Sequence, residues 1–228
     1  MDKPWLALVL ALAACSSPSQ PPPEPDAGPI GGCKLAYLGD PSAEPSMEVI
    51  ALGPGGELQP ISEGSSISLI FPPQGGRVVF AGVRVTNVDP CAVRVAGALR
   101  DLTTKQVRLD TRIINLEPTD DGYGRSAPTD ISTFSNIAAC PNQWAEDDLF
   151  DKPYELTVTL TDRDGKKITK IMTVTPRCDE PGYEAECLCM CAGDYVLGMQ
   201  CDPDAGPLDP DLDAGADVNS SDASGGSP

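Results

Sequence analysis

Histidine is absent from this chain of 228 residues, aromatic residues make up only 5% of it, and acidic residues outnumber basic ones by 34 to 16. Without histidine the chain cannot form a Ser-His-Asp triad, a histidine general base, a histidine-ligated zinc site or a haem site with a proximal histidine. The scarcity of aromatic rings leaves few platforms on which sugars or bases stack. The net charge of −18 disfavours nucleic acids and anionic membrane surfaces as partners.

The acidity lies mostly outside the central part of the chain. From Pro45 to Arg177 there are 17 acidic and 14 basic residues, whereas 12 acidic and no basic residues follow from Cys178 to the end. Blocks of like charge usually form solvated faces or tails. We therefore interpret the acidity as a source of solubility and surface repulsion, not as a recognition site.

The first residues are typical of an export signal. Apolar residues run from Trp5 to Ala14, and a helix of ten residues covers about 15 Å, half of a bilayer core of about 30 Å. This length indicates the hydrophobic region of a signal peptide and not a membrane span. The run ends in Leu12-Ala13-Ala14-Cys15, which resembles the bacterial lipobox. The resemblance implies that residues 1–14 are a lipoprotein signal peptide and that Cys15 is lipidated, with palmitate among its acyl chains.

The same resemblance implies a location. Acyl chains on Cys15 would anchor the chain in place of a transmembrane helix. Ser16, not aspartate, follows the cysteine, and by the bacterial sorting rule this favours the outer membrane. We expect a protein of the cell envelope, facing either the periplasm or the outside. Residues 15–32 are Pro-rich and residues 202–228 are Asp-rich, so we expect a disordered tether and a disordered acidic tail.

The central part predicts an all-β fold. Short β-rich runs separated by Gly-Pro, Asp-Pro and Asp-Gly turn signals indicate seven or eight strands of an antiparallel β-sandwich over residues 33–177, with its core at 47–176. The predicted strands are residues 48–52, 66–71, 78–87, 92–101, 106–115, 131–137, 154–161 and 167–175.

The last two predicted strands give the clearest pattern. Between Tyr154 and Thr161, apolar and polar residues alternate, which indicates a strand with one buried and one wet face. Gly165 in the following turn accepts a positive φ and closes a hairpin with residues 167–175. This hairpin resembles the terminal hairpin of bacterial Ig-like and PKD-like domains. The resemblance implies an Ig-like sandwich and no particular activity.

A second resemblance covers an earlier part of the chain. Pro73-Gln74-Gly75-Gly76, followed by Val83-Arg84-Val85, is similar to the start of the sandwich in a group of uncharacterised myxobacterial-type surface lipoproteins. Those proteins usually carry an aromatic residue or histidine after the two glycines, whereas Arg77 stands here. The resemblance implies the fold and the location, and it implies no reaction.

Eight cysteines besides Cys15 form an even set, which in an exported chain predicts disulfides. Five of them lie within residues 178–201, a stretch too short for a hydrophobic core, so we expect a small disulfide-rich annex there. Since five is odd, at least one must pair outside it. We favour Cys91 with Cys140 in the sandwich, and Cys33 with the annex. The disulfide candidates are Cys33, Cys91, Cys140, Cys178, Cys187, Cys189, Cys191 and Cys201.

Metal binding stays open as an alternative at two kinds of residue. Cys187, Cys189 and Cys191, with Cys201, offer four thiols, the ligand set of many structural zinc sites. Carboxylates suit a hard cation such as Ca²⁺, although the later ligands of an EF-hand are missing and loops or turns explain the clusters equally well. The carboxylate candidates are Asp147, Asp148, Asp151, Asp162 and Asp164.

These observations favour a protein that is not an enzyme. The sequence contains no G-x-S-x-G, S-x-x-K or phosphate-binding glycine motif, and paired cysteines leave no thiol nucleophile. We expect no catalytic residues, no cofactor apart from the Ca²⁺ alternative, and a lipid-anchored module that presents loops to a protein or glycan partner or acts as a spacer. The alternatives are a Ca²⁺-stabilised adhesion module and an accessory subunit of an envelope hydrolase.

Overall fold

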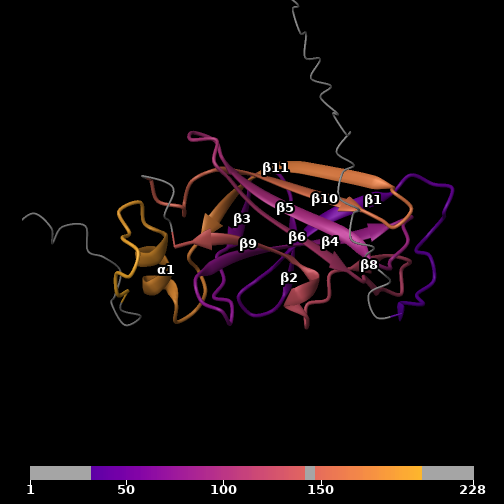
Figure 1. The fold of residues 1–228 in the computed structure, drawn as a ribbon, viewed down its shortest axis with the longest axis horizontal. Coiled ribbons are helices and arrows are strands. Elements are labelled where there is room, and N and C mark those ends of the chain that lie inside the picture. The colour runs from indigo at the N-terminus through magenta and orange to yellow at the C-terminus, as the bar shows by residue number, and fades with distance from the viewer. Residues whose placement is uncertain (1–31, 142–146, 202–228) are drawn as a thin grey trace, which may run out of the picture.

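Two β-sheets make up most of the computed structural model, which describes residues 32–141 and 147–201 (Figure 1). The expected signal peptide, Cys15, all but the last residue of the tether, and the acidic tail lie outside the described residues. The strands are β1 Ser46–Leu52, β2 Leu58–Ile61, β3 Ser65–Ser68, β4 Arg77–Thr86, β5 Val93–Asp101, β6 Val107–Ile114, β7 Glu117–Pro118, β8 Gly124–Arg125, β9 Ser135–Cys140, β10 Tyr154–Thr161 and β11 Lys167–Arg177. The helices are the 3₁₀ turn η2 Ile131–Thr133 and α1 Glu184–Cys191.

The first sheet has the order β2-β1-β4-β8-β7, with β9 also paired to β4, and the second has the order β3-β11-β10-β5-β6. The all-β class predicted from the sequence is confirmed. The expectation of purely antiparallel sheets is wrong at one edge, where β3 runs parallel to β11. The chain reaches β3 by crossing between the sheets at Gly64, whose N–H donates to the Thr173 carbonyl. A crossover of this kind, unlike a hairpin, permits a parallel pair.

One hydrophobic core lies between the two sheets. The apolar side chains of β10 are buried and the polar ones are not, as the alternation predicted. They pack in the same cluster as Val49 of β1 and Val83 of β4, which belong to the opposite sheet. The hairpin is also confirmed, since Thr161 lies opposite Lys167 and Gly165 has φ of 85°. The facing sheets therefore bury one shared layer of side chains, as in a sandwich.

Strand β4 is buried on both faces. Its outer face supplies Val78 and Phe80 to a second, smaller cluster with Phe134. The rings of Phe80 and Phe134 meet edge to face, with centroids 6.4 Å apart. A Cβ on Gly82 would lie 2.7 Å from the Phe134 ring, so this glycine is needed for the close approach. The second cluster explains why residues 78–83 of β4 form an uninterrupted apolar run.

The strand predicted over residues 131–137 is partly wrong. Residues 131–133 form η2, and the strand β9 begins only at Ser135. Asp130 caps this turn, because its carboxylate accepts hydrogen bonds from the Ser132 N–H and hydroxyl. Local capping of this kind competes with strand formation. The turn places Phe134 over the outer face of β4.

Asp101 gives the fold a pH-dependent contact at the turn between β5 and β6. Its Oδ1 accepts hydrogen bonds from the Thr103 and Thr104 N–H groups, at 2.6 and 2.9 Å. Burial raises the pKa of this carboxyl, but the hydrogen bonds from Thr104 and Thr103 and the charge of Arg108 together outweigh burial, so the net pKa is lowered. The ionised carboxylate is therefore favoured by folding.

We expect Asp101→Asn to lower the free energy of unfolding at neutral pH, because the amide oxygen is a weaker acceptor than the carboxylate. When the pKa of a carboxyl is lower in the folded protein than in the unfolded chain, its ionised form stabilises the fold at pH values above the unfolded pKa. This stabilisation is lost as the pH falls through the folded pKa. The difference between variant and wild type should therefore shrink below about pH 4. Urea unfolding of both proteins at pH 7, 5 and 3 measures this difference in the free energy of unfolding. A difference that does not change with pH would contradict the stabilising role of the ionised Asp101 carboxylate.

Candidate functional site

Residues 178–201, the C-terminal segment, pack against one end of the two sheets. The helix α1 turns Cys187 and Cys191 inward, and both are fully buried. These cysteines are four residues apart, so they share one face of the helix, whereas Cys189 points elsewhere. Glu184 and Glu186 occupy the first turn, where carboxylates interact favourably with the helix dipole. Within the described residues, no helix combines the length and the apolar character that a membrane crossing requires.

The structure pairs all eight described cysteines, but not as expected. The disulfides join Cys33 to Cys91, Cys140 to Cys191, Cys178 to Cys187 and Cys189 to Cys201. The pairing of Cys91 with Cys140 and that of Cys33 with the annex are therefore wrong. The expectation that one of the five C-terminal cysteines reaches outside the segment is confirmed by Cys191.

The length of β4 explains the wrong pairing. Cys140 lies opposite Arg77 at the start of β4, whereas Cys91 follows soon after the end of this strand. Ten residues of strand cover about 33 Å. Disulfides need Cα atoms within about 7 Å. Cys140 therefore pairs with the C-terminal segment at one end of β4, and Cys91 pairs with Cys33, near the start of the described chain, at the other end.

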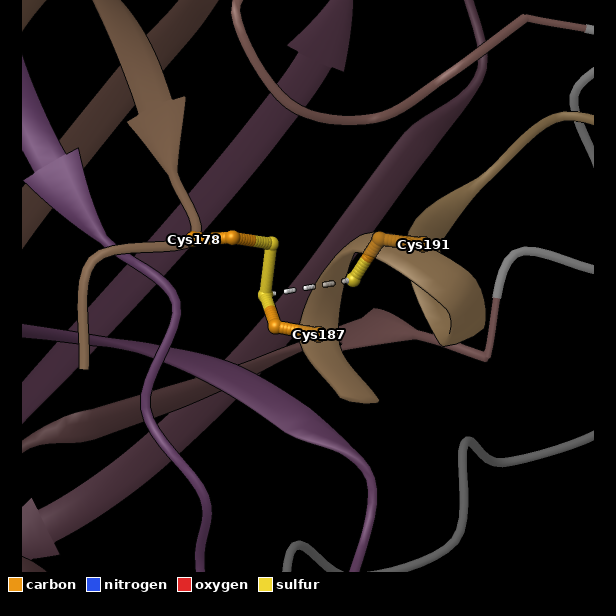
Figure 2. Close-up of side chains that lie close together, drawn as sticks. All are labelled: Cys178, Cys187 and Cys191. Atoms are coloured by element: carbon orange, nitrogen blue, oxygen red, sulfur yellow. Dashed lines mark hydrogen bonds between the residues drawn. A yellow bond between two sulfur atoms is a disulfide. The ribbon is translucent and has the colours of Figure 1, made fainter. Parts of the chain in front are cut away.

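Three sulfur atoms gather where α1 meets the end of β11 (Figure 2). The Sγ atoms of Cys178, Cys187 and Cys191 lie within 4.8 Å of one another, and those of Cys187 and Cys191 are 3.9 Å apart. All three belong to disulfides, and a metal ion needs thiolates. The zinc site of four thiols that the sequence left open is not formed either, because two of its proposed ligands, Cys189 and Cys201, form their own disulfide. The cluster is therefore a packed pair of disulfides.

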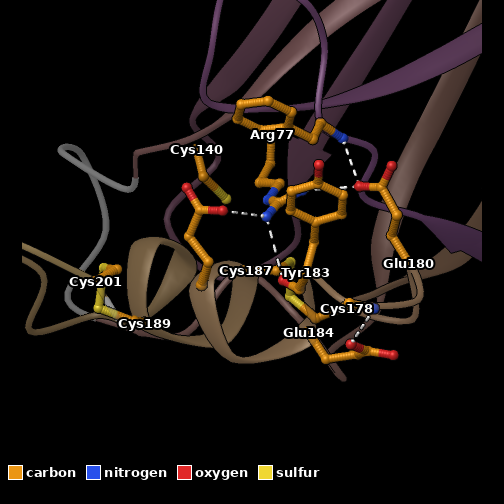
Figure 3. Close-up of polar contacts among 12 residues, drawn as sticks. Arg77, Cys140, Cys178, Glu180, Tyr183, Glu184, Cys187, Cys189 and Cys201 are labelled. Atoms are coloured by element: carbon orange, nitrogen blue, oxygen red, sulfur yellow. Dashed lines mark hydrogen bonds and ion pairs between the residues drawn. A yellow bond between two sulfur atoms is a disulfide. The ribbon is translucent and has the colours of Figure 1, made fainter. Parts of the chain in front are cut away.

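Arg77, the first residue of β4, contacts the C-terminal segment through its side chain (Figure 3). Its side chain is fully buried, and its guanidinium lies 2.8 Å from a Glu180 oxygen and 3.1 Å from a Glu186 oxygen. It also donates to the Tyr183 carbonyl, at 3.2 Å. The guanidinium carbon lies 5.1 Å from the centre of the Phe71 ring and 5.3 Å from that of Tyr183.

The electrostatics of Arg77 favour a positioning role. Burial lowers the pKa of its guanidinium, and the nearby Glu186 and Glu180 carboxylates act in the opposite direction. Arginine nevertheless stays protonated at physiological pH. Glu180 also accepts a hydrogen bond from the Phe71 N–H, at 2.8 Å. The buried charge is thus shared between two carboxylates that both belong to the C-terminal segment, which fixes where the segment sits.

Residues 195–199, the apolar loop, project from this fixed base. Val196, Leu197 and Met199 are 65, 68 and 45% exposed, which places three exposed apolar side chains within four residues. The Met199 N–H donates to the Val196 carbonyl at 2.8 Å, and Gly198 has φ of 92°, as the third residue of a type II turn requires. The disulfide between Cys189 and Cys201 closes the loop at its base. The exposed tip is therefore held in a defined shape.

The carboxylate candidates at residues 147–151 do not converge on one point. Asp147 pairs with Lys152 at 3.1 Å, and Asp151 pairs with Arg177. Asp148 accepts a hydrogen bond from the Gly193 N–H at 3.0 Å. This last contact supports the C-terminal end of α1, so we assign Asp148 a structural role.

The two candidate Ca²⁺ ligands in the β10–β11 turn, Asp162 and Asp164, lie in different environments. Asp162 is buried, and its Oδ1 accepts a hydrogen bond from the Lys166 N–H at 2.8 Å, which closes the turn. Asp164 is exposed. Among residues 32–141 and 147–201, the only group of three side chains with metal-ligand spacing is the cysteine cluster.

Comparisons of the chain with protein-family models, with curated proteins and with solved structures give no match. The functional interpretation therefore depends on the sequence and the structure of this chain. Sequence reasoning missed both Arg77 and the apolar loop. Two signals in the C-terminal segment were present in the sequence. The spacing of Cys187 and Cys191 by one helical turn indicates the helix α1, and the apolar run between Cys191 and Cys201 indicates the loop.

Proposed function

We propose that the chain is a lipid-anchored protein of the cell envelope, whose β-sheet body serves as a non-catalytic binding or structural module. The anchor in this proposal is Cys15 at the end of the lipobox-like segment, and Ser16 favours the outer membrane. The resemblance to myxobacterial-type lipoproteins supports the same location.

The observation that carries this proposal is the pairing of all eight described cysteines. Disulfides form and persist in oxidising compartments and are rare where thiols are kept reduced. The disulfide between Cys33 and Cys91 ties the start of the described chain to the loop before β5, and that between Cys140 and Cys191 ties the C-terminal segment to β9. A protein stabilised in this way fits an envelope that exchanges solutes with the outside.

The body of the module is proposed to be Ig-like. In Ig domains, strand F lies between strands C and G in one sheet, while strand B lies beside strand E in the other. The order β11-β10-β5 corresponds to G-F-C, and the pairing of β4 with β9 corresponds to B with E. Ig folds carry their functions in loops, so this assignment supports a binding or structural role. The C-terminal segment would be a disulfide-rich annex to the sandwich.

The direct test replaces Cys15 in the full chain, expressed in bacteria with labelled palmitate. We expect the wild type to carry the label and to sediment with membranes, and Cys15→Ser to carry none and to keep its signal peptide. Ser16→Ala is the matched control, because it alters the neighbouring residue and leaves the sulfur that accepts the lipid. Equal labelling of wild type and Cys15→Ser would overturn the lipid anchor.

A further inference from the structure

Strand β6 forms a long open edge of the second sheet, because the strand order ends there. Its register with β5 is continuous over eight residues. The Asp101 N–H donates to the Gln106 carbonyl, and in an antiparallel ladder the hydrogen-bonded pairs recur at every second residue. The backbone N–H and C=O groups of Leu109, Thr111 and Ile113 therefore point away from β5. Within the described part of the chain, no group forms a hydrogen bond with them.

The outer face of this edge is apolar and exposed. Val107, Leu109 and Ile113 are 54, 66 and 37% exposed, and Thr111 between them is exposed as well. These residues alternate along the strand, so they stand on one face of it. Proteins commonly protect an edge with lysine, proline, a bulge or a very short strand, and β6 has none of these devices. An edge of this kind is a template for pairing with another strand.

The other edges of the two sheets are better protected. Strand β3 has four residues, β7 has two, and β2 contains Pro60. The edge of β9 is covered from β6, because the Asn136 N–H donates to the Asp110 carboxylate at 2.9 Å. The part of β11 that precedes its contact with β3 is also open, but it carries Lys167 and Lys170. Lysine on an edge disfavours pairing between copies, because the charges repel each other.

We propose that β6 is a self-association surface, and that it pairs antiparallel with β6 of a second copy about a two-fold axis at Thr111. This pairing joins the second sheets of the two copies into one continuous sheet by strand addition. Leu109 of each copy then lies opposite Ile113 of the other, so their open backbone groups find partners and their exposed side chains are covered. This inference goes beyond the function proposed above and does not depend on the lipid anchor.

The charged residues of β6 select this register. Asp110 and Arg112 stand on the other face of the strand and form an ion pair, with the N and O atoms 2.8 Å apart. With the axis at Thr111, Asp110 of each copy lies opposite Arg112 of the other, so both contacts join unlike charges. An axis at Asp110 would place the two aspartates opposite each other and Arg108 opposite Arg112, which is unfavourable.

Other arrangements and partners fit less well. An axis at Leu109 also joins unlike charges, but Ile113 would then lie opposite Lys105, which is outside the strand. Residues 202–228 of the same chain contain seven aspartates and no alternating apolar run, so they do not supply a strand. A different protein would have to present a strand that complements these charges, whereas a second copy does so by symmetry.

The experiment introduces a cysteine at the proposed axis. In Thr111→Cys, the new side chains of the two copies lie opposite each other, with Cα atoms about 5.5 Å apart, within the range of a disulfide. Thr169→Cys is the matched control, because Thr169 is an exposed threonine in the same row of the same sheet, on the open part of β11. Full chains are expressed in bacteria, treated with a mild oxidant and separated without reduction. We expect a covalent dimer of Thr111→Cys and monomers of Thr169→Cys.

A second pair of variants tests the contact along the strand. Leu109→Lys in the Thr111→Cys chain places a charge opposite Ile113, and it should lower the cross-linked fraction about tenfold, because a two-fold interface contains the change twice. Ile171→Lys is its control and should leave the cross-link unchanged. Ile171 on β11 is 63% exposed and Leu109 is 66% exposed, so lysine is tolerated by the fold at both positions. Circular dichroism checks that both variants are folded.

Four results would overturn the self-association surface. These are the absence of a dimer of Thr111→Cys, equal dimers of Thr111→Cys and Thr169→Cys, a dimer that survives Leu109→Lys, and a cross-link to a different protein. Palmitate labelling of the same samples reports separately on the anchor. A cross-linked dimer without the label would remove the proposed anchor and leave the pairing of β6 in place, so a failure of either claim is recognised independently.

Discussion

Replacing Arg77 with alanine is expected to lower the free energy of unfolding by about 3–5 kcal/mol, the usual loss when one partner of a buried ion pair is removed. The variant leaves Glu180 and Glu186 facing an empty space beside Phe71, and it removes the donor to the Tyr183 carbonyl. For a domain of this size, such a loss lowers the melting temperature by about 10 °C. Thermal unfolding followed by circular dichroism measures it.

Arg84→Ala is the matched control for this prediction. Arg84 stands on the same strand and pairs with Glu48 and Asp121, but its side chain is 26% exposed and both partners are more than half exposed. Exposed ion pairs contribute at most about 1 kcal/mol. If Arg84→Ala destabilised the protein as much as Arg77→Ala, burial of the Arg77 pair would not be what holds the C-terminal segment.

The second large effect is expected from the disulfide that joins α1 to the first sheet. Replacing Cys140 and Cys191 together with alanine opens a loop closed across 51 residues, for which chain entropy gives a loss of about 4 kcal/mol. The loss should couple to Arg77, because both contacts hold the same helix against the same end of β4. In a double-mutant cycle, Arg77→Ala should therefore cost less in the absence of this disulfide than in its presence.

Removal of Cys189 and Cys201 is the comparison for this variant. That disulfide spans only 12 residues and encloses the largely exposed apolar loop, so its loss should cost less than about 3 kcal/mol. Chemical denaturation of the two double variants under oxidising conditions ranks them. Equal losses, or an Arg77→Ala effect that is unchanged without the Cys140 disulfide, would show that the helix is held by other contacts.

The sequence predicted the sheets well because their information is local. Alternation along residues 154–161 specifies which side chains face the core, and Gly165 specifies where the chain turns back, so β10 was located with its bounds. The 3₁₀ turn at Ile131 was missed because one capping residue, Asp130, decides it. A strand was predicted at residues 66–71, close to β3, but its parallel pairing with β11 was missed because the partner is more than a hundred residues away.

The C-terminal segment could be predicted only in outline. The odd number of cysteines required a bond to another part of the chain, and Cys191 makes it. The spacing of Cys187, Cys189 and Cys191 suggested side-by-side thiols, but a helix turns Cys189 away from the other two. The role of Arg77 depends on Glu180 and Glu186, which are separated from it by more than a hundred residues and carry no pattern of their own.

The proposed role depends on export, anchoring and oxidation of the same molecule, and the intact mass of the chain isolated from bacterial membranes tests all three at once. We expect a polypeptide that begins at Cys15, carries acyl groups there, and is lighter by eight hydrogens than its reduced form, because four disulfides are closed. A polypeptide that still begins at Met1 without acyl groups, or that reacts with eight equivalents of a thiol reagent before reduction, would contradict this account.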